Sequence, residues 1–102
     1  MFRQGDVLLI PREAPIPKKA ARAEENGTAI LAHGEATGHS HAFPTGDHRI
    51  QFFRDSEGAY LTVTAEAPLL HQEHATIFVP PGDYDVVRQV EYSPEAIRNV
   101  AD

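Results

Sequence analysis

The stretch HRIQFFRDSEGAYLTVT, residues 48–64, decides the fold class. Side chains of an extended strand alternate between its two faces, and apolar and polar residues alternate in both halves of this stretch. The Asp-Ser-Glu-Gly sequence of residues 55–58 is typical of a turn. We therefore predict a β-hairpin with strands at residues 48–54 and 59–64. Leu61 and Val63 face inward in this prediction, and Phe52 and Phe53 project to opposite faces.

Short apolar runs rich in branched residues recur on both sides of this hairpin, with turn-forming residues between them. Five further segments have strand character: residues 7–10, 28–32, 37–43, 69–79 and 84–92. Residues 11–27 form a long loop in this interpretation, and Ser93-Pro94-Glu95 begins a short C-terminal helix over residues 94–100. The sequence thus predicts a single all-β domain over residues 1–102, a small barrel or sandwich of about seven or eight short antiparallel strands.

Composition excludes several functional classes. The formal net charge of −6 argues against binding to a nucleic-acid backbone, which requires clustered cations. The chain contains no cysteine, so disulfides, thiolate ligands and cysteine nucleophiles are excluded. No apolar run is long enough for a signal peptide core or a membrane span. We expect a cytoplasmic, soluble protein in which any metal ligand is a histidine, a carboxylate or water.

The segment GEATGHSHAF, residues 34–43, carries the first candidate site residues. His39 and His41 are two residues apart in a predicted strand, so both imidazoles leave the same face. Glu35 lies nearby and is interpreted as a ligand, as a partner that orients an imidazole, or as a surface carboxylate. The spacing predicts that the two histidines are metal ligands.

A second histidine pair, His71 and His74 in HQEH, follows about thirty residues later. A separation of three suits a helical turn or a strand with a β-bulge. In the alternative, His71 and Glu73 share a face and His74 points elsewhere. Two doublets that each have a carboxylate nearby are typical of a divalent metal site, whereas His33 and His48 lack a partner at ligand spacing.

Two functional classes follow from such a site. A closed site of four protein ligands indicates a structural, sensing or interaction module, and this is the favoured hypothesis. An open site with a bound water indicates an enzyme, with Glu73 or Glu35 as the general base. Zinc is expected first, and nickel, iron or manganese are the alternatives. No sequence feature identifies a substrate.

Two families resemble this sequence. The segments RQGDVLL, GHSHAF, HQEH and PPGDYDVVRQVEYSPEAIR together resemble a family of small uncharacterised bacterial proteins that also occur in phage and plasmid contexts; the resemblance implies no activity. His-x-His on a strand with a later histidine and a Pro-Gly turn also resembles the cupins, which implies a metal-binding double-stranded β-helix. Cupins place a glutamate ligand a few residues after His-x-His, where this chain has Pro44, Thr45 and Gly46.

Self-association is the last expectation from the sequence. A domain of this size has a limited core and open sheet edges. Tyr84, Val86, Val90 and Tyr92 share one face of the last predicted strand, and part of such an apolar set is expected outside the core. We predict a homodimer or a higher symmetric oligomer, with Tyr84 or Tyr92 at the contact.

Overall fold

The computed structural model describes residues 1–34 and 38–89. Within these residues it contains ten short strands and no helix. The strands are β1 (Phe2–Gln4), β2 (Val7–Pro11), β3 (Ala21–Arg22), β4 (Ile30–His33), β5 (Ser40–Ala42), β6 (Ile50–Asp55), β7 (Gly58–Val63), β8 (Ala67–Leu69), β9 (Ile77–Val79) and β10 (Gly82–Arg88). The all-β prediction is confirmed. The predicted C-terminal helix over residues 94–100 lies outside the described residues.

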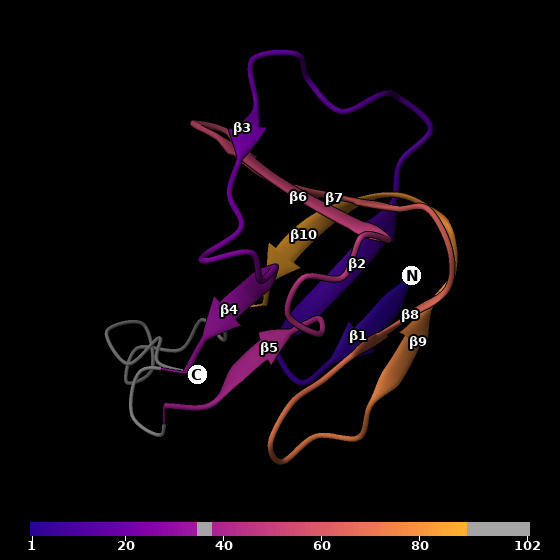
Figure 1. The fold of residues 1–102 in the computed structure, drawn as a ribbon. Coiled ribbons are helices and arrows are strands. Elements are labelled where there is room, and N and C mark those ends of the chain that lie inside the picture. The colour runs from indigo at the N-terminus through magenta and orange to yellow at the C-terminus, as the bar shows by residue number, and fades with distance from the viewer. Residues whose placement is uncertain (35–37, 90–102) are drawn as a thin grey trace, which may run out of the picture.

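Six of these strands form one antiparallel sheet in the order β1-β2-β10-β7-β6-β3 (Figure 1). β4 pairs with β5 and β8 pairs with β9, so these strands make two further two-stranded sheets. β1 and β3 are the two ends of the large sheet and do not pair with each other. The described strands therefore do not close into the barrel that was one of the two predicted architectures.

The hairpin predicted from residues 48–64 is β6–β7. Its register pairs Ile50 with Val63 and Asp55 with Gly58. The Asp55 carboxylate closes the turn, because its Oδ1 accepts hydrogen bonds from the backbone amides of Glu57 and Gly58. Phe52 is completely buried and Phe53 is half-buried on the opposite face, which confirms the predicted alternation.

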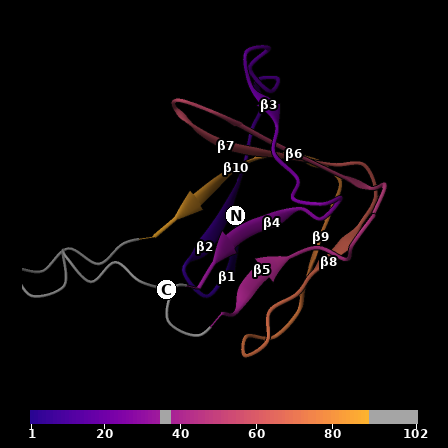
Figure 2. The ribbon, with the colours of Figure 1, turned by 60° about the vertical axis from the view of Figure 1, so that its left-hand side comes forward.

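The core lies between the large sheet and the two small ones. Buried side chains from both sides form one cluster, and turning the molecule shows β4–β5 and β8–β9 lying together over the large sheet (Figure 2). The buried members are Val7, Leu9, Ala29, Leu31, Phe43, Ile50, Phe52, Leu61, Val63, Ala67, Leu69, Val79 and Tyr84. The antiparallel pairing leaves β4–β5 and the connection between β8 and β9 near the β1–β2 turn, and the candidate site lies there.

Two sequence-based expectations are wrong in their details. Tyr84 is only 3% exposed, packs edge-on against Phe2 and donates a hydrogen bond to the Pro80 carbonyl, so it is not available for an oligomer contact. The run 69–79 is not one strand: β8 ends at Leu69 and β9 begins at Ile77, because these two segments pair with each other. The second histidine pair therefore lies in the connection between them. Tyr92 lies outside the described residues.

No helix able to cross a membrane occurs in residues 1–34 and 38–89.

Candidate functional site

The structure brings all four predicted ligand histidines together. His41 lies in the middle of β5, His39 directly precedes that strand, and His71 and His74 lie in the β8–β9 connection. The ring centroid of His71 is 4.3 Å from that of His41, 4.6 Å from that of His74 and 5.6 Å from that of His39. The His41 and His74 centroids are 5.8 Å apart. We call these four residues the histidine cluster.

His41 is the buried member of the histidine cluster, with 5% of its surface exposed. The side chain of Gln4 holds it: the Gln4 Nε2 donates to the carbonyls of Leu69, at 2.8 Å, and Ala75, at 3.0 Å. These bonds turn the Gln4 Oε1 toward the His41 Nδ1, 2.9 Å away. Because an amide oxygen only accepts, Nδ1 carries the proton of neutral His41 and Nε2 keeps its lone pair.

The pKa of His41 is lowered from 6.5 to about 4, because burial disfavours the charged ring and His71 would add a positive charge beside it. His41 is thus neutral at pH 7. Its Nε2 lies 3.3 Å from the Oδ1 of Asp6, the residue that follows Gly5 in the β1–β2 turn. A lone pair and a carboxylate oxygen therefore face each other across this short distance.

Asp6 is fixed by the end of β10. Its Oδ2 accepts a hydrogen bond from the Arg88 Nε at 2.7 Å, and its backbone carbonyl accepts from the Gln89 amide at 2.7 Å. Burial raises the pKa of Asp6, but the hydrogen bond and the charge of Arg88 outweigh it and hold that pKa below its ordinary value. Asp6 is consequently a carboxylate at neutral pH.

His71 is oriented by its own loop. Its Nδ1 accepts hydrogen bonds from the backbone amides of Glu73, at 3.0 Å, and His74, at 3.2 Å. In this arrangement the proton of neutral His71 is on Nε2. Burial and the neighbouring His74 lower the pKa of His71, which favours the neutral ring.

Gly5 forms one wall of the histidine cluster. Its φ is +58°, in the left-handed region that glycine adopts readily. A Cβ atom at this position would lie 2.6 Å from the His74 Nε2, closer than atoms can pack, and 3.2 Å from the His41 Cε1, which is a tight contact. The absence of a side chain at Gly5 is therefore what lets both imidazoles approach the β1–β2 turn.

The structure describes only one of the two candidate glutamates, Glu73. The carboxylate of Glu73 lies 2.8 Å from the His39 Nδ1, although the Glu73 side chain is largely exposed. Glu35 lies outside the described residues. The alternative in which His71 and Glu73 share a strand face is wrong, because both residues lie in the connection between β8 and β9.

The histidine cluster borders a surface cavity of about 170 Å³. Asp6, Gly34, Glu73 and Arg88 complete the lining. Among the described residues, no group of three or more His, Asp or Glu side chains is already arranged to hold a metal ion. The side chains are close together but do not converge on one point.

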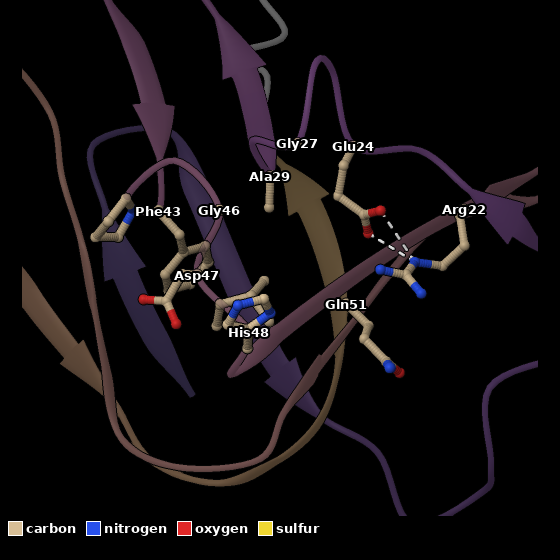
Figure 3. Close-up of a pocket in the computed structure, with 11 residues that line it drawn as sticks. Arg22, Glu24, Gly27, Ala29, Phe43, Gly46, Asp47, His48 and Gln51 are labelled. Atoms are coloured by element: carbon tan, nitrogen blue, oxygen red, sulfur yellow. Dashed lines mark hydrogen bonds and ion pairs between the residues drawn. The ribbon is translucent and has the colours of Figure 1, made fainter.

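Figure 3 shows a separate cavity of about 310 Å³, which contains His48. Its charged groups are paired locally: Arg22 with Glu24, and Asp47 with Arg49 through two contacts of 2.8 and 2.6 Å. His33 does not line the cavity of the histidine cluster and contacts Glu25 at 2.9 Å. Neither histidine joins the site, as their spacing predicted.

Sequence analysis did not identify Gln4, Gly5, Asp6 and Arg88 as site residues. The residues Gly5-Asp6 are typical of a turn, and nothing else in the sequence indicates that they contribute to the site. Gln4 is 2% exposed, which is unusual for glutamine, but burial is not visible in the sequence. Arg88 is half-buried, and a buried arginine requires an acidic partner, which here is Asp6.

Comparison with known proteins identifies one family. A family model described as a domain of unknown function (DUF8820) matches residues 3–89. The match includes the histidine cluster together with Gln4, Asp6 and Arg88. No curated protein and no solved structure matched the chain.

Proposed function

We propose that this chain, which belongs to the DUF8820 family of unknown function, is a small metal-binding module whose histidine cluster holds one divalent transition metal ion. His41, His71 and His74 are the central ligands in this proposal, because their rings are mutual neighbours. His39 or Asp6 supplies the fourth position. Ligands of this type, without thiolate, suit zinc first and admit nickel, iron or manganese.

The observation that carries the proposal is the contact between the His41 Nε2 and the Asp6 Oδ1. Both atoms are hydrogen-bond acceptors when His41 is neutral and repel each other at 3.3 Å, and the Arg88 guanidinium binds the other carboxylate oxygen of Asp6, Oδ2. The Gln4 side chain and the low pKa of His41 both keep the Nε2 lone pair available. A metal ion bound to Nε2 removes this repulsion.

Metal binding requires a local change at His71. Its Nδ1 already accepts two backbone hydrogen bonds, so ligation by Nε2 requires the proton to move from Nε2 to Nδ1 and those two bonds to break. His71 is half-buried and His74 is exposed, so both rings have room to turn. His41 and Asp6 are held by Gln4 and Arg88 and serve as the fixed half of the site.

We favour an accessory, sensing or interaction module over an enzyme, because the sequence contains no substrate-specific motif. One observation favours the enzyme as a second candidate: the histidine cluster opens into a cavity of about 170 Å³, which has room for a ligand water. In that case the exposed Glu73, beside His39, is the candidate general base. Glu35 is the other candidate.

Metal analysis tests the proposal directly. Protein prepared without a histidine tag is incubated separately with zinc, nickel, iron and manganese, dialysed, and analysed for bound metal. We expect close to one equivalent of zinc, and much less when His41 and His74 are both replaced by alanine. A matched control, His33→Ala with His48→Ala, also removes two imidazoles and is expected to keep the metal. Less than about a tenth of an equivalent of every metal would refute the site.

X-ray absorption at the zinc edge separates the two functional classes. Four nitrogen or oxygen ligands from the protein, unchanged by added azide or thiocyanate, support the module. A water ligand that these anions replace supports the enzyme.

A further inference from the structure

Two arginines lie on the core-facing side of the large sheet, next to a third cavity. Arg54 of β6 is opposite Ala59 of β7, and Ala59 is opposite Val86 of β10, so these three side chains share one face. Arg88 shares that face, because it is two residues beyond Val86 and opposite the buried Val7. Arg54 is exposed and Arg88 is half-buried, so both guanidinium groups lie at the border of the core, where a ligand can reach them.

These residues line a cavity of about 360 Å³ between the sheet and β4. Most of its lining is aliphatic, including Ile30, Leu31, Ala59 and Val86. A volume of this size lies within the range of small-molecule sites. Arg88 also lines the cavity of the histidine cluster, so the two cavities are neighbours.

The charges around this cavity have one sign. Its charged lining residues are Arg54 and Arg88, and its described lining contains no carboxylate, although the whole chain has a net charge of −6. Glu25 already pairs with His33, and Asp6 with Arg88. Among the described residues, Arg54 has no carboxylate within ion-pair distance. Its guanidinium carbon lies 5.2 Å from the centre of the Phe52 ring.

We infer that this cavity binds a small carboxylic acid with an aliphatic body. The aliphatic body occupies the space between β4 and β10, and the carboxylate binds the guanidinium group of Arg54. A free carboxylate would supply the anion that Arg54 lacks among the described residues, and the aliphatic lining would exclude small hydrophilic anions. This site is distinct from the proposed metal site and does not require a metal.

Sodium decanoate, below the concentration at which it forms micelles, is a suitable probe. It is titrated into metal-free, ¹⁵N-labelled full-length protein and followed by amide NMR. We expect saturable shifts at Ala32, Ala59 and Val86. Decanol, which has the same chain without the charge, is expected to bind at least about tenfold more weakly.

Two substitutions that each remove one positive charge test where the carboxylate binds. Arg54→Gln is expected to weaken decanoate binding about fivefold or more and to leave decanol unchanged. Arg22→Gln is the control, because Arg22 stacks on Phe53 on the other face of the sheet. It is expected to leave decanoate binding unchanged. Arg54→Lys keeps the charge and is expected to keep most of the affinity.

Three results of the titrations with unmodified protein would overturn the inference. They are the absence of saturable shifts, equal binding of decanol and decanoate, and shifts centred on His41 and His74 instead of β4 and β10. Decanoate binding that Arg54→Gln leaves intact would also contradict it.

Discussion

Gln4 is the residue on which the order of the histidine cluster depends most. Its buried amide makes three hydrogen bonds that join β1 to His41 and to both ends of the β8–β9 connection. Gln4→Leu leaves the His41 Nδ1 and two carbonyls without their partner. We expect a loss of about 2–4 kcal/mol in the free energy of unfolding.

Urea denaturation of metal-free protein measures this loss. Gln51→Leu is the matched control, because Gln51 lies on β6 away from the histidine cluster, and we expect it to change stability by less than about 0.5 kcal/mol. Equal effects of the two substitutions would show that the Gln4 amide does not hold the site together.

His41 also makes the stability of the metal-free protein depend on pH. Its pKa is 6.5 as an ordinary side chain and about 4 in the folded protein, so between these values the unfolded chain binds a proton that the folded chain does not. Acidification from pH 6.5 to 4 therefore favours unfolding. Above pH 6.5 both states are neutral at His41, and its contribution is constant.

Urea midpoints measured at pH 7 and pH 4.5 test this direction. We expect the wild-type protein to lose more stability over this interval than His41→Gln, which cannot take up the proton. The comparison removes the contribution of the carboxylates, which the two proteins share. An identical loss in both proteins would contradict the lowered pKa of His41.

At the scale of elements, the β1–β2 turn controls access to the histidine cluster. Gly5→Ala adds a methyl group 2.6 Å from the His74 Nε2 and places alanine at a φ of +58°. Gly46→Ala is the matched control, because its φ is +70° and its Cβ would meet nothing within 4 Å. Both are expected to lower stability by about 1 kcal/mol through the backbone alone.

Only Gly5→Ala is expected to weaken zinc binding, by tenfold or more, because its methyl group displaces His74. Competition with a coloured zinc chelator measures the affinity of each variant. A Gly5→Ala protein that binds zinc as tightly as Gly46→Ala would exclude His74 from the ligands or show that its ring moves away from Gly5 on binding.

The elements that could be predicted from the sequence are those whose residue pattern is complete within one short segment. The β6–β7 hairpin has alternating residues and a turn whose Asp55 side chain caps its own backbone, so both signals lie within one short segment. β1 and β3 have three and two residues, too few for a periodic pattern. The segment 69–79 looked continuous because the pairing of β8 with β9 is not encoded locally.

The same distinction applies to the site. The four histidines were predicted as one site from their spacing, and the structure brings them together. Gln4 and Asp6 come from the N-terminal end of the chain and reach His41 only because the β4–β5 sheet packs on the large sheet that contains β1 and β2. Such contacts have no local sequence signal.

For the molecule as a whole, self-association remains a prediction, but its location changes. With Tyr84 buried, the exposed apolar residues of the large sheet are Ile10, 37% exposed, and Val87, 39% exposed. Val87 is opposite Leu8 on the outer face of the β2–β10 pair. This patch is a suitable contact for a two-fold dimer.

We expect sedimentation to show a dimer at tens of micromolar and Val87→Lys to weaken it at least about tenfold. Phe78→Lys is the control, because Phe78 is 62% exposed but lies on β9, away from this face. A wild-type species of 11 kDa would refute the dimer, and an unchanged dimer in Val87→Lys would refute the location.

The central claim, that the histidine cluster binds one metal ion, is tested most directly by the ring nitrogens themselves. Zinc is titrated into ¹⁵N-histidine-labelled protein while two-bond proton–nitrogen NMR spectra report every imidazole. We predict that the signals of His41, His71 and His74 change until one equivalent is bound, with His41 keeping its proton on Nδ1. His33 and His48 serve as internal controls and should not change. Signals of the histidine cluster that do not respond to zinc, or a response confined to His33 and His48, would contradict the claim.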